Sequence, residues 1–444
     1  MVSSGRMPSN MLSIRCSWSS SPSRAPNLRS NSSSLRSPVS RPRRSASAPG
    51  SFRNMSLIAP GSRPCLRQKA AKLSQTGVVS TPPKSNSTAS YAPPAMAEQT
   101  TEAPEGIDAA NVEAWFESNV PGAEPPLSFE RISGGRSNLT FGVRDSAGGS
   151  WALRRPPLGE RLGSAHDMGR EHRVISALQD APVPVPPVAG FCEDESVSGA
   201  PFYVMGFVEG PILRSAEDAR AVGEADRAAI GERVVDTLVA IHSVDPDAVG
   251  LGELGRKEAY VERQLKRWHG QWEKSKTREL GLVDDVHRRL AAAIPEQGPA
   301  TIVHGDYRLD NVILRPDLSD VAAVVDWELC TLGDPLADVG LLLVYWSEPG
   351  DDFMPLFAPA TIAPGFISRE QVKARYAERS GRDLAQVDFF VALGYWKLAI
   401  ILEGVYARYS GGQYGKTEEG FEEFAKIVER LAEAAGQAVG RLDG

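Results

Sequence analysis

The spacing of apolar residues changes once along this chain, near residue 210, and this change limits the folds open to it. Short strand-like runs fill residues 129–207, among them Leu139–Arg144 and Pro201–Phe207 (PFYVMGF). One helical segment, Arg170–Leu178, interrupts these runs and carries its apolar residues on one face. After residue 210 the apolar residues recur at helical spacing. The sequence therefore predicts the α+β class, with a small mixed sheet followed by a mainly helical region.

Five segments after residue 210 have the spacing of amphipathic helices. They are Asp226–His242, Lys257–Lys274, Val283–Ala293, Phe389–Tyr409 and Phe421–Ala435. Another helix is predicted over Ala109–Asn119, ahead of the sheet. Between the third and fourth of the five helices, residues Ile302–Trp327 form one β-like island. That island holds the polar residues on which the functional interpretation depends.

The first 97 residues differ from the rest of the chain in composition. They contain no Asp or Glu, 14 of the 49 Lys and Arg residues, and many Ser and Pro residues. Such a segment cannot build a core, so we expect residues 1–97 to be disordered and residues 98–127 to hold the first helix and a linker. Ser- and Arg-rich, acid-free composition is typical of an organellar transit peptide, here for the chloroplast rather than the mitochondrion because Ser dominates and no amphipathic helix is clear. The alternative is an unstructured extension, with translation from Met96 giving a cytoplasmic protein.

Charge, hydropathy and cysteine content of residues 98–444 exclude several classes of protein. Residues 98–444 contain 35 Lys and Arg, since 14 of the 49 lie in residues 1–97, and all 56 Asp and Glu. Their formal net charge is therefore −21, whereas that of the whole chain is −7. So acidic a protein is not expected to bind nucleic acid. The strongest candidate for a membrane span, Val339–Trp346, is far shorter than the roughly 18–20 residues required. Cys192 and Cys330 lack the spacing of metal ligands or of a disulfide framework, as expected in a reducing compartment.

A polar loop within the island, His304–Asn311 (HGDYRLDN), has the spacing of a phosphotransfer site. Asp306 precedes Asn311 by five residues, as the base and the metal-binding Asn do in a kinase catalytic loop. Asp326 follows at the end of the next strand. Phosphoryl transfer needs a carboxylate at the acceptor hydroxyl, oxygen ligands for Mg²⁺ and cations for the phosphates. The pattern predicts Asp306 as catalytic base, Asn311 and Asp326 as Mg²⁺ ligands, and Arg308 as a cation that neutralises the transferring phosphoryl group.

Each of these residues also has a simpler explanation on its own. An Asp after a strand is commonly a turn or capping residue, and Asp310 beside Asn311 can form an Asx-turn. His304, in an apolar run, is better explained as a hydrogen-bonded scaffold than as a base. Turn chemistry rarely produces the whole pattern, so we favour the catalytic interpretation. Asp334 and Asp338 are expected to cap and anchor the helix that follows them.

His304–Asn311 and Val325–Asp338 (VDWELCTLGDPLAD), at this spacing, resemble the aminoglycoside phosphotransferase and choline kinase-like superfamily. Further matching words are Gly134–Thr140 (GGRSNLT), Leu153–Pro157 (LRRPP) and Ala200–Met205 (APFYVM). Within that superfamily, the sequence resembles the kinase-like domain fused to acyl-CoA dehydrogenases in some eukaryotes, and free-standing bacterial relatives of that domain. The resemblance implies a two-lobed protein-kinase-like fold, with a nucleotide-binding N-lobe over residues 128–208 and a helical C-lobe over residues 209–444.

The same resemblance implies a set of residues that bind ATP. They are Gly134, Gly135, Ser137, Asn138, Arg154, Glu171, Met205 and Val208. The glycines would let the loop backbone approach the phosphates closely. Arg154 takes the position of the strand Lys of protein kinases, and Glu171 that of its partner on the helix. The alternative for these two is an exposed ion pair without a catalytic role. Met205 and Val208 belong to the hinge whose backbone would meet adenine.

The resemblance implies an ATP- and Mg²⁺-dependent phosphotransferase that acts on a hydroxyl of a small molecule. Candidates for the acceptor pocket are Trp268, Trp272, Tyr395, Lys397, Arg408 and Tyr409. Basic residues there would suit an anionic acceptor, such as a hydroxy acid or a hydroxyacyl-CoA. Two other functions stay open: a non-catalytic nucleotide- or CoA-binding pseudokinase module, and a metal-dependent phosphohydrolase that uses His304, Asp306 and Asp326.

Overall fold

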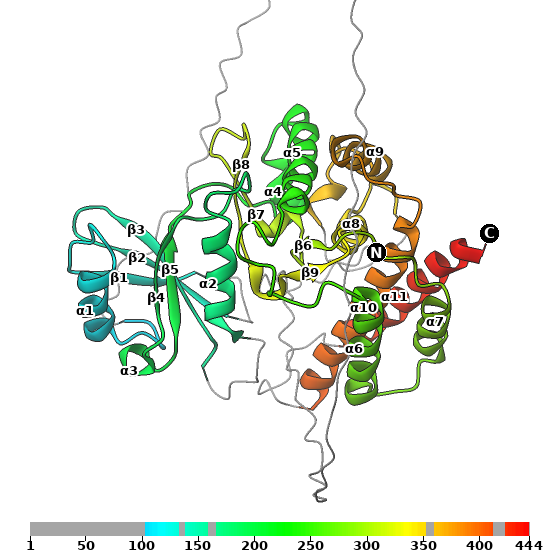
Figure 1. The fold of residues 1–444 in the computed structure, drawn as a ribbon, viewed down its shortest axis with the longest axis horizontal. Coiled ribbons are helices and arrows are strands. Elements are labelled where there is room, and N and C mark those ends of the chain that lie inside the picture. Colours follow the sequence, from blue (N-terminus) through cyan, green and yellow to red (C-terminus); the bar gives the residue numbers. More distant parts are fainter. Residues whose placement is uncertain (1–102, 133–137, 159–165, 352–358, 412–421, 444) are drawn as a thin grey trace, which may run out of the picture. The chain divides into compact units, whose positions relative to one another are not determined.

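Five antiparallel strands form one sheet in the order β1-β2-β3-β5-β4 (Figure 1). The strands are β1 Ser128–Arg131, β2 Leu139–Arg144, β3 Ser150–Arg155, β4 Val188–Cys192 and β5 Phe202–Gly206. The helices of this region are α1 Ala109–Asn119, α2 Met168–Ala177 and the short α3 Glu195–Ser198. This computed structural model describes residues 103–132, 138–158, 166–351, 359–411 and 422–443. The predicted leader, residues 1–97, lies outside the described residues.

Both faces of the sheet are covered, and the side chains of β5 show how. Phe202 and Val204 belong to the hydrophobic cluster that includes residues of α1. Tyr203 and Met205, which alternate with them, belong to the larger cluster that includes residues of α2. Successive side chains of a strand point to opposite faces, so a strand that is apolar throughout is buried on both sides. The buried strand predicted over Pro201–Phe207 is confirmed.

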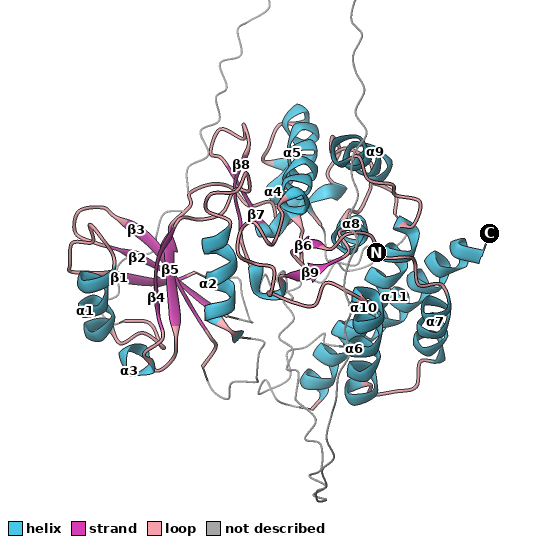
Figure 2. Ribbon diagram, viewed as in Figure 1, coloured by secondary structure: helices cyan, strands magenta, loops and turns pink. Residues whose placement is uncertain are grey.

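Helices dominate the chain after the sheet (Figure 2). They are α4 Ala216–Arg220, α5 Glu224–Ser243, α6 Tyr260–Ser275, α7 Gly281–Ala292, α8 Leu336–Tyr345, α9 Arg369–Ser380, α10 Val387–Ser410 and α11 Glu422–Gly440. The five helices predicted here are present, and the α+β class is confirmed. α4 and α9 are not predicted. α9 buries only Val372 and Tyr376, too few apolar positions to give a clear period.

Among the described residues, one helix is long and apolar enough to cross a membrane by length and composition. It is α10, and 78% of its apolar window is buried inside the protein, where it packs against α6, α8 and α11. Core helices have the same composition, so α10 is weak evidence for a membrane span. Val339–Trp346, the candidate chosen from the sequence for its unbroken apolar run, lies largely in α8, whereas Lys397 and Glu403 interrupt the apolar run of α10.

The predicted island consists of short antiparallel strand pairs, β6 with β9 and β7 with β8. The strands are β6 Thr301–Val303, β7 Val312–Leu314, β8 Val321–Val324 and β9 Thr331–Gly333. β9 lies beyond the predicted end of the island at Trp327. Pairing of β7 with β8 places Asn311, which precedes β7, beside the residues that follow β8. The Val325 N–H donates to the Asn311 carbonyl at 3.0 Å. Local strand pairing thus brings Asn311 close to Asp326.

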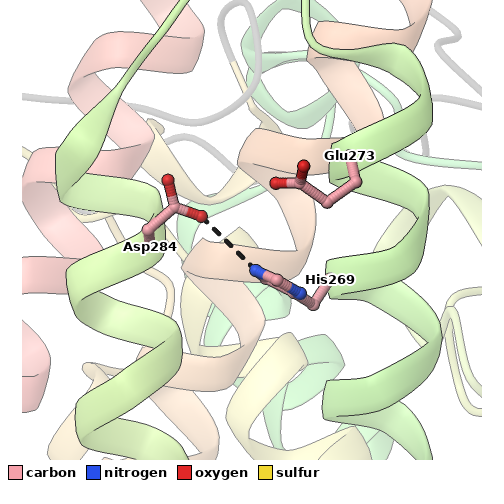
Figure 3. A group of neighbouring side chains, drawn as sticks. All are labelled: His269, Glu273 and Asp284. Atoms are coloured by element: carbon pink, nitrogen blue, oxygen red, sulfur yellow. Dashed lines mark ion pairs between the residues drawn. The ribbon is translucent and has the colours of Figure 1, made fainter.

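α6 and α7 are joined by residues 276–280 and face each other. Figure 3 shows that His269 and Glu273 of α6 project toward Asp284 of α7. His269 Nε2 lies 3.4 Å from Asp284 Oδ1.

On another side of α6, the buried side chain of Trp268 contacts Lys397 of α10. The Lys397 ammonium group lies 5.4 Å from the centroid of the Trp268 ring.

Candidate active site

Asp306 lies in the loop after β6, beside a glycine that the turn requires. Gly305 has a φ of 84°, and a Cβ at this position would lie 2.8 Å from the carbonyl oxygen of Leu329. Glycine adopts this backbone region without steric penalty. The Asp306 carboxylate accepts a hydrogen bond from Asn311 Nδ2 at 3.2 Å on Oδ2, and one from the Tyr345 hydroxyl at 3.4 Å on Oδ1. Contacts from two elements therefore orient the predicted base.

The backbone of this loop is anchored from α8. The N–H groups of His304 and Gly305 donate to the Asp338 carboxylate at 2.6 and 2.8 Å. His304 is fully buried, and its Nε2 lies 3.2 Å from the carbonyl oxygen of Val325, so its interpretation as a scaffold is confirmed. The Asp334 carboxylate accepts a hydrogen bond at 2.9 Å from the N–H of Leu336, the first residue of α8, although the N-cap position itself is taken by Pro335. The prediction for Asp338 needs correction, because its carboxylate binds the backbone of His304 and Gly305 rather than its own helix.

Asp338 is a buried carboxylate whose charge the surrounding groups stabilise. Burial opposes ionisation, yet hydrogen bonding and charge from His242, with the contacts to His304 and Gly305, hold the pKa of Asp338 below its ordinary value. A depressed pKa contributes stability above the unfolded-state pKa of about 3.9, and this stability is lost as the pH falls through the folded-state pKa. The anchor should therefore weaken in acid.

Replacing Asp338 by Asn is expected to lower the free energy of unfolding by about 1.5–3 kcal/mol at pH 7, the contribution of hydrogen bonds to a charged group. The difference from the natural protein should begin to shrink below about pH 4, where the carboxyl of the unfolded chain takes up a proton, and should be lost as the pH falls through the lower folded-state pKa of Asp338. Urea unfolding at several pH values measures this. Glu370→Gln, at a side chain that is 81% exposed, is the surface control. A difference that does not change with pH would contradict this role of the charge.

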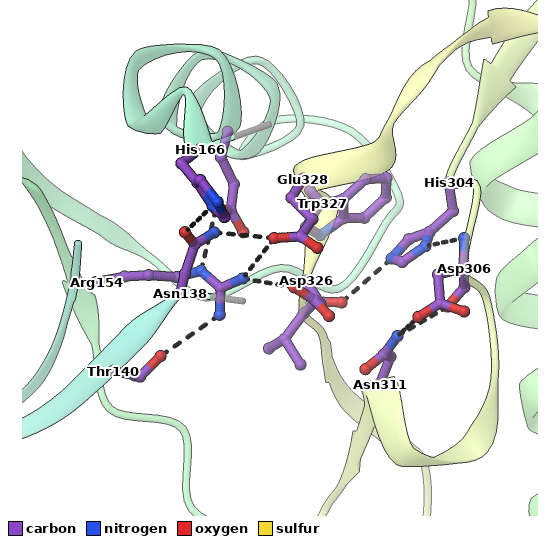
Figure 4. A network of polar contacts seen from close by, with 12 residues as sticks. Asn138, Thr140, Arg154, His166, His304, Asp306, Asn311, Asp326, Trp327 and Glu328 are labelled. Carbon is purple, nitrogen blue, oxygen red and sulfur yellow. Dashed lines mark hydrogen bonds and ion pairs between the residues drawn. The ribbon is translucent and has the colours of Figure 1, made fainter. Parts of the chain in front are cut away.

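Asp326 has a left-handed backbone conformation that redirects its side chain. Its φ is 71° and its ψ 53°. Asp and Asn tolerate this region better than other residues with a side chain. Figure 4 shows the Asp326 carboxylate turned toward Arg154, between the sheet and the loop that carries Asp306. Nothing in the strand-terminal position of Asp326 in the sequence indicates this conformation.

The residues around Asp326 offer oxygen ligands for a hard cation. Asn311 is fully buried, and its Nδ2 donates to the Asp306 carbonyl at 2.8 Å, which orients the amide. Glu328, two residues after Asp326, is also close, since its Oε2 lies 3.7 Å from Arg154. Mg²⁺ prefers carboxylate and amide oxygens and keeps several waters. The donor set of Asn311, Asp326 and Glu328 therefore fits Mg²⁺.

Arg154 of β3 is the centre of a buried ionic network. Its guanidinium lies 3.0 Å from Glu171, 2.5 Å from Asp326 and 3.7 Å from Glu328, and its side chain is 8% exposed. Burial alone would lower the pKa of Arg154, but the negative charge of Glu171 and of its neighbours raises it well above its ordinary value. The predicted Arg154–Glu171 pair is thus present. The alternative of an exposed pair is wrong, because the side chains of Arg154 and Glu171 are only 8% and 1% exposed.

Replacing Arg154 by Met is expected to lower the free energy of unfolding by about 3–5 kcal/mol, because removal of one partner leaves buried charges uncompensated. Glu171 and Asp326 would lose the cation between them. Arg154→Lys keeps the charge and should cost less, although Lys cannot bind in the same forked geometry. Urea unfolding of both variants is the measurement. If Arg154→Met is as stable as the natural protein, the network does not hold β3 to the residues after β8.

Asp306 and Asp326 line the same pocket. Its walls are formed by Gly305, Asp306, Asp326, Glu328, Leu329, Leu341, Tyr345, Lys397, Leu398 and Ile401. A neighbouring pocket also includes Gly305 and Lys397, with Gln264, Trp268 and Leu393 among its other walls. Lys397 Nζ donates to the Gly305 carbonyl at 3.2 Å, next to Asp306. Of the acceptor-pocket candidates, Trp268 and Lys397 line these pockets.

The other four acceptor-pocket candidates lie elsewhere. Trp272 is fully buried in the core, and Tyr409 stacks on Phe424 with 5.9 Å between the ring centroids. Neither residue lines the two pockets, nor do Tyr395 and Arg408. The aromatic and basic composition of these helices did not distinguish core positions from pocket positions.

Some of the predicted nucleotide-binding residues are described by the structure and others are not. Gly134, Gly135 and Ser137 lie outside the described residues. Asn138 is 2% exposed, its Nδ2 donates to Glu328 Oε2 at 2.9 Å, and its Oδ1 lies 3.0 Å from His166 Nδ1. Asn138 thus connects the start of β2 to the residues after β8.

Met205 and Val208 complete the predicted nucleotide-binding set, and Arg308 is the cation predicted beside Asp306. Arg308 is 3% exposed, pairs with Asp310, and lies 3.8 Å from Asp306 through its Nε. Its guanidinium carbon also lies 5.1 Å from the ring centroid of Tyr345. Met205 is buried in β5, and Val208 is half-buried just after it. A role for Arg308 in neutralising the phosphoryl group stays a prediction.

Several residues of the site were not predicted from the sequence. Glu328 and Tyr345 line the pocket with the two Asp residues. His166 is half-buried beside Asn138, and burial with the charge of Arg154 lowers its pKa. Glu328 belongs to the same tripeptide as Asp326, Asp326-Trp327-Glu328, so its place in the sequence could have indicated it as a site residue. His166 lies in the segment Ala165–Met168, which also matches the resembled family, although no role was assigned to it there. Tyr345 comes from a distant segment and carries no local signal.

The antiparallel sheet, the helical region after it and the grouping of Asp306, Asn311 and Asp326 define a kinase-like phosphotransferase fold. The phosphotransferase enzyme family matches residues 128–390. The chain belongs to this family.

Three known proteins show what the chain is similar to. Acyl-CoA dehydrogenase family member 11 of Gallus gallus is 36% identical over 325 residues, which cover 71% of this chain and 41% of the relative. The chain thus spans about two fifths of the length of that relative. A Ralstonia eutropha crystal structure, provisionally described as an aminoglycoside phosphotransferase, has a TM-score of 0.65 and 32% identity, and the match covers 76% of this chain and 99% of that one. The GDP and kanamycin complex of APH(2″)-IIIa has a TM-score of 0.51 and 14% identity, covering 72% and 98%, and shows the fold alone.

Proposed function

We propose that this chain is a kinase that transfers the γ-phosphate of ATP, with Mg²⁺, to a hydroxyl group of a small molecule. The observation that carries the proposal is the shared pocket of Asp306 and Asp326, with Asn311 hydrogen-bonded to Asp306. The Asp–Asn–Asp arrangement supplies the base and the oxygen ligands that phosphoryl transfer requires. GDP binding by a protein of the same fold supports nucleotide use.

In the proposed reaction Asp306 orients the acceptor hydroxyl and takes its proton. The acceptor oxygen then forms a bond to the γ-phosphorus while the bond from that phosphorus to the bridging oxygen of ADP breaks. Asn311 and Asp326 would hold Mg²⁺, which when bound would neutralise charge on the β- and γ-phosphates. Arg154, a planar cation suited to phosphate, lies beside Asp326 to bind the nucleotide.

We further propose that the acceptor is an anion, such as a hydroxy acid or a hydroxyacyl-CoA. Lys397 supports this, because it lines both pockets and its ammonium group lies 3.2 Å from the Gly305 carbonyl, one residue from Asp306. A carboxylate or phosphate held by Lys397 would place a nearby hydroxyl within reach of the base. Similarity to an acyl-CoA dehydrogenase family member also favours an acyl-CoA or its free acid.

Incubation of the full chain with Mg·ATP and a panel of hydroxy acids and hydroxyacyl-CoAs tests the proposal. We expect ADP and a phosphorylated acceptor in equal amounts, followed by a coupled ADP assay and by mass spectrometry. Nucleotide-dependent thermal stabilisation without transfer to any member would favour a non-catalytic module. Release of phosphate from a phosphoester without ATP would favour a phosphohydrolase.

A further inference from the structure

α6 and α7 bring three side chains with metal-binding atoms together, away from the pocket of Asp306. His269, Glu273 and Asp284 each offer one ligand atom, and these atoms lie within 4.8 Å of one another. His269 and Glu273 are four residues apart on α6, a spacing that places both on one face of a helix. Asp284 reaches toward them from α7, across the gap between the two helices (Figure 3).

We propose that His269, Glu273 and Asp284 form a binding site for a divalent transition-metal ion, best matched by Zn²⁺. One imidazole and two carboxylates are a ligand set that Zn²⁺ accepts, with water at the remaining position. The imidazole sets this site apart from the oxygen-only set of Asn311, Asp326 and Glu328, which suits Mg²⁺. Two carboxylates and a neutral imidazole also balance the charge of a divalent cation.

The imidazole of His269 is held in an orientation suited to a ligand. Its ring stacks on His287, with 4.0 Å between centroids and 13° between the planes. His287 stacks in turn on buried Trp396, at 5.5 Å and 18°. This column of rings fixes the plane of His269 while Nε2 points to Asp284, 3.4 Å away. Neighbouring groups that fix the orientation of a ligand raise the affinity of metal sites.

The contacts present do not by themselves explain this grouping. The side chains of His269 and Asp284 are 33% and 42% exposed, and an exposed ion pair contributes little to stability. The Glu273 side chain is 48% exposed and lies 3.4 Å from the ammonium group of Lys276. When the metal ion binds, Glu273 would give up this ion pair and bind the metal ion instead. Zn²⁺ bonds of about 2.0–2.2 Å require the ligand atoms to come closer together than 4.8 Å, and rotation of the exposed Glu273 side chain allows this.

A cation at this position would join α6 to α7 across residues 276–280. α6 also carries Trp268 and Gln264, which line the pocket beside Lys397. The proposed ion would therefore restrain α6, the helix that contributes Trp268 and Gln264 to the wall of that pocket. The three proposed ligands are separate from the residues of the proposed phosphotransfer site, because none of them lines either pocket.

Titration of Zn²⁺ into the full chain, in excess Mg²⁺ to occupy oxygen-only sites, tests the proposal. We expect one equivalent of Zn²⁺ to bind and the melting temperature to rise, since an ion bound by the folded state stabilises it. Hydrogen exchange at residues 276–280 should slow when Zn²⁺ is added. His269→Gln and Asp284→Asn should each weaken binding by at least about tenfold, the loss that even an outer partner of a metal ligand causes.

Glu262→Gln, at an exposed position of α6, is the matched control and should bind Zn²⁺ as the natural chain does. Optical absorption of Co²⁺ gives a second readout. Co²⁺ bound to the natural chain by an imidazole and two carboxylates should show visible absorption bands. These bands should be absent when Co²⁺ is added to His269→Gln. Equal Zn²⁺ affinity in His269→Gln and the natural chain would overturn the proposal. Absence of stoichiometric binding in excess Mg²⁺ would also overturn it.

Discussion

Asp306→Asn is expected to lower the turnover of phosphate transfer by about 100- to 10,000-fold, the usual contribution of a positioned general base. Asn keeps the size of the side chain and can still accept the hydrogen bond from Asn311 Nδ2, which spans 3.2 Å in the natural chain. It cannot take a proton from the acceptor hydroxyl. Binding of Mg·ATP should be nearly unchanged, because Asp306 is not among the proposed metal ligands. Turnover and nucleotide affinity are both measured on the same preparation.

Asp317→Asn is the matched control for this substitution, since Asp317 is exposed in the turn between β7 and β8. It should leave turnover as it is in the natural chain. If Asp306→Asn turns over at the natural rate, Asp306 is not the base, and the pocket that it lines has another purpose.

Asp326→Asn should abolish most of the Mg²⁺-dependent part of nucleotide binding and reduce turnover by at least about 100-fold. A metal ion at the transferring phosphoryl group contributes several kcal/mol, and each 1.4 kcal/mol is about tenfold in rate. Asn is chosen because it tolerates the φ of 71° at this position as well as Asp does, so the backbone should be retained. Thermal stabilisation by ATP, with and without Mg²⁺, is the measurement.

The two substitutions should therefore differ in one respect. Asp306→Asn keeps the Mg²⁺-dependent stabilisation by nucleotide, whereas Asp326→Asn loses it. Full Mg²⁺-dependent stabilisation in Asp326→Asn would remove Asp326 from the metal site and leave its ion pair with Arg154 as its role.

The spacing of polar residues in the sequence predicted those site residues that neighbouring segments of the chain bring together. Asp306 and Asn311 stand in one loop, and pairing of β7 with β8 brings Asp326 to them. The pairing of Arg154 with Glu171 followed from the resemblance to a known family, and the structure adds that it is buried. Most helices were also predicted, because their apolar residues recur at helical spacing.

Contacts between distant segments could not be read from the sequence. Arg154 meets Asp326 and Glu328 only because the sheet packs against the residues after β8. Asp338 holds the catalytic loop through two backbone N–H groups, and no residue pattern distinguishes this from a helix cap. Lys397 was among the six acceptor-pocket candidates, but the sequence did not separate it from Tyr395, Arg408 and Tyr409, because only the packing of α10 decides which side chains line the pocket.

The most direct test of the account is a crystal structure of the chain with Mn²⁺ in place of Mg²⁺ and a non-hydrolysable ATP analogue. We expect the anomalous signal of Mn²⁺ within bonding distance of Asn311 Oδ1 and the Asp326 carboxylate, with the γ-phosphate facing Asp306. A cation held elsewhere, or a nucleotide bound away from Asp306, would contradict the assignment of this pocket as a phosphotransfer site.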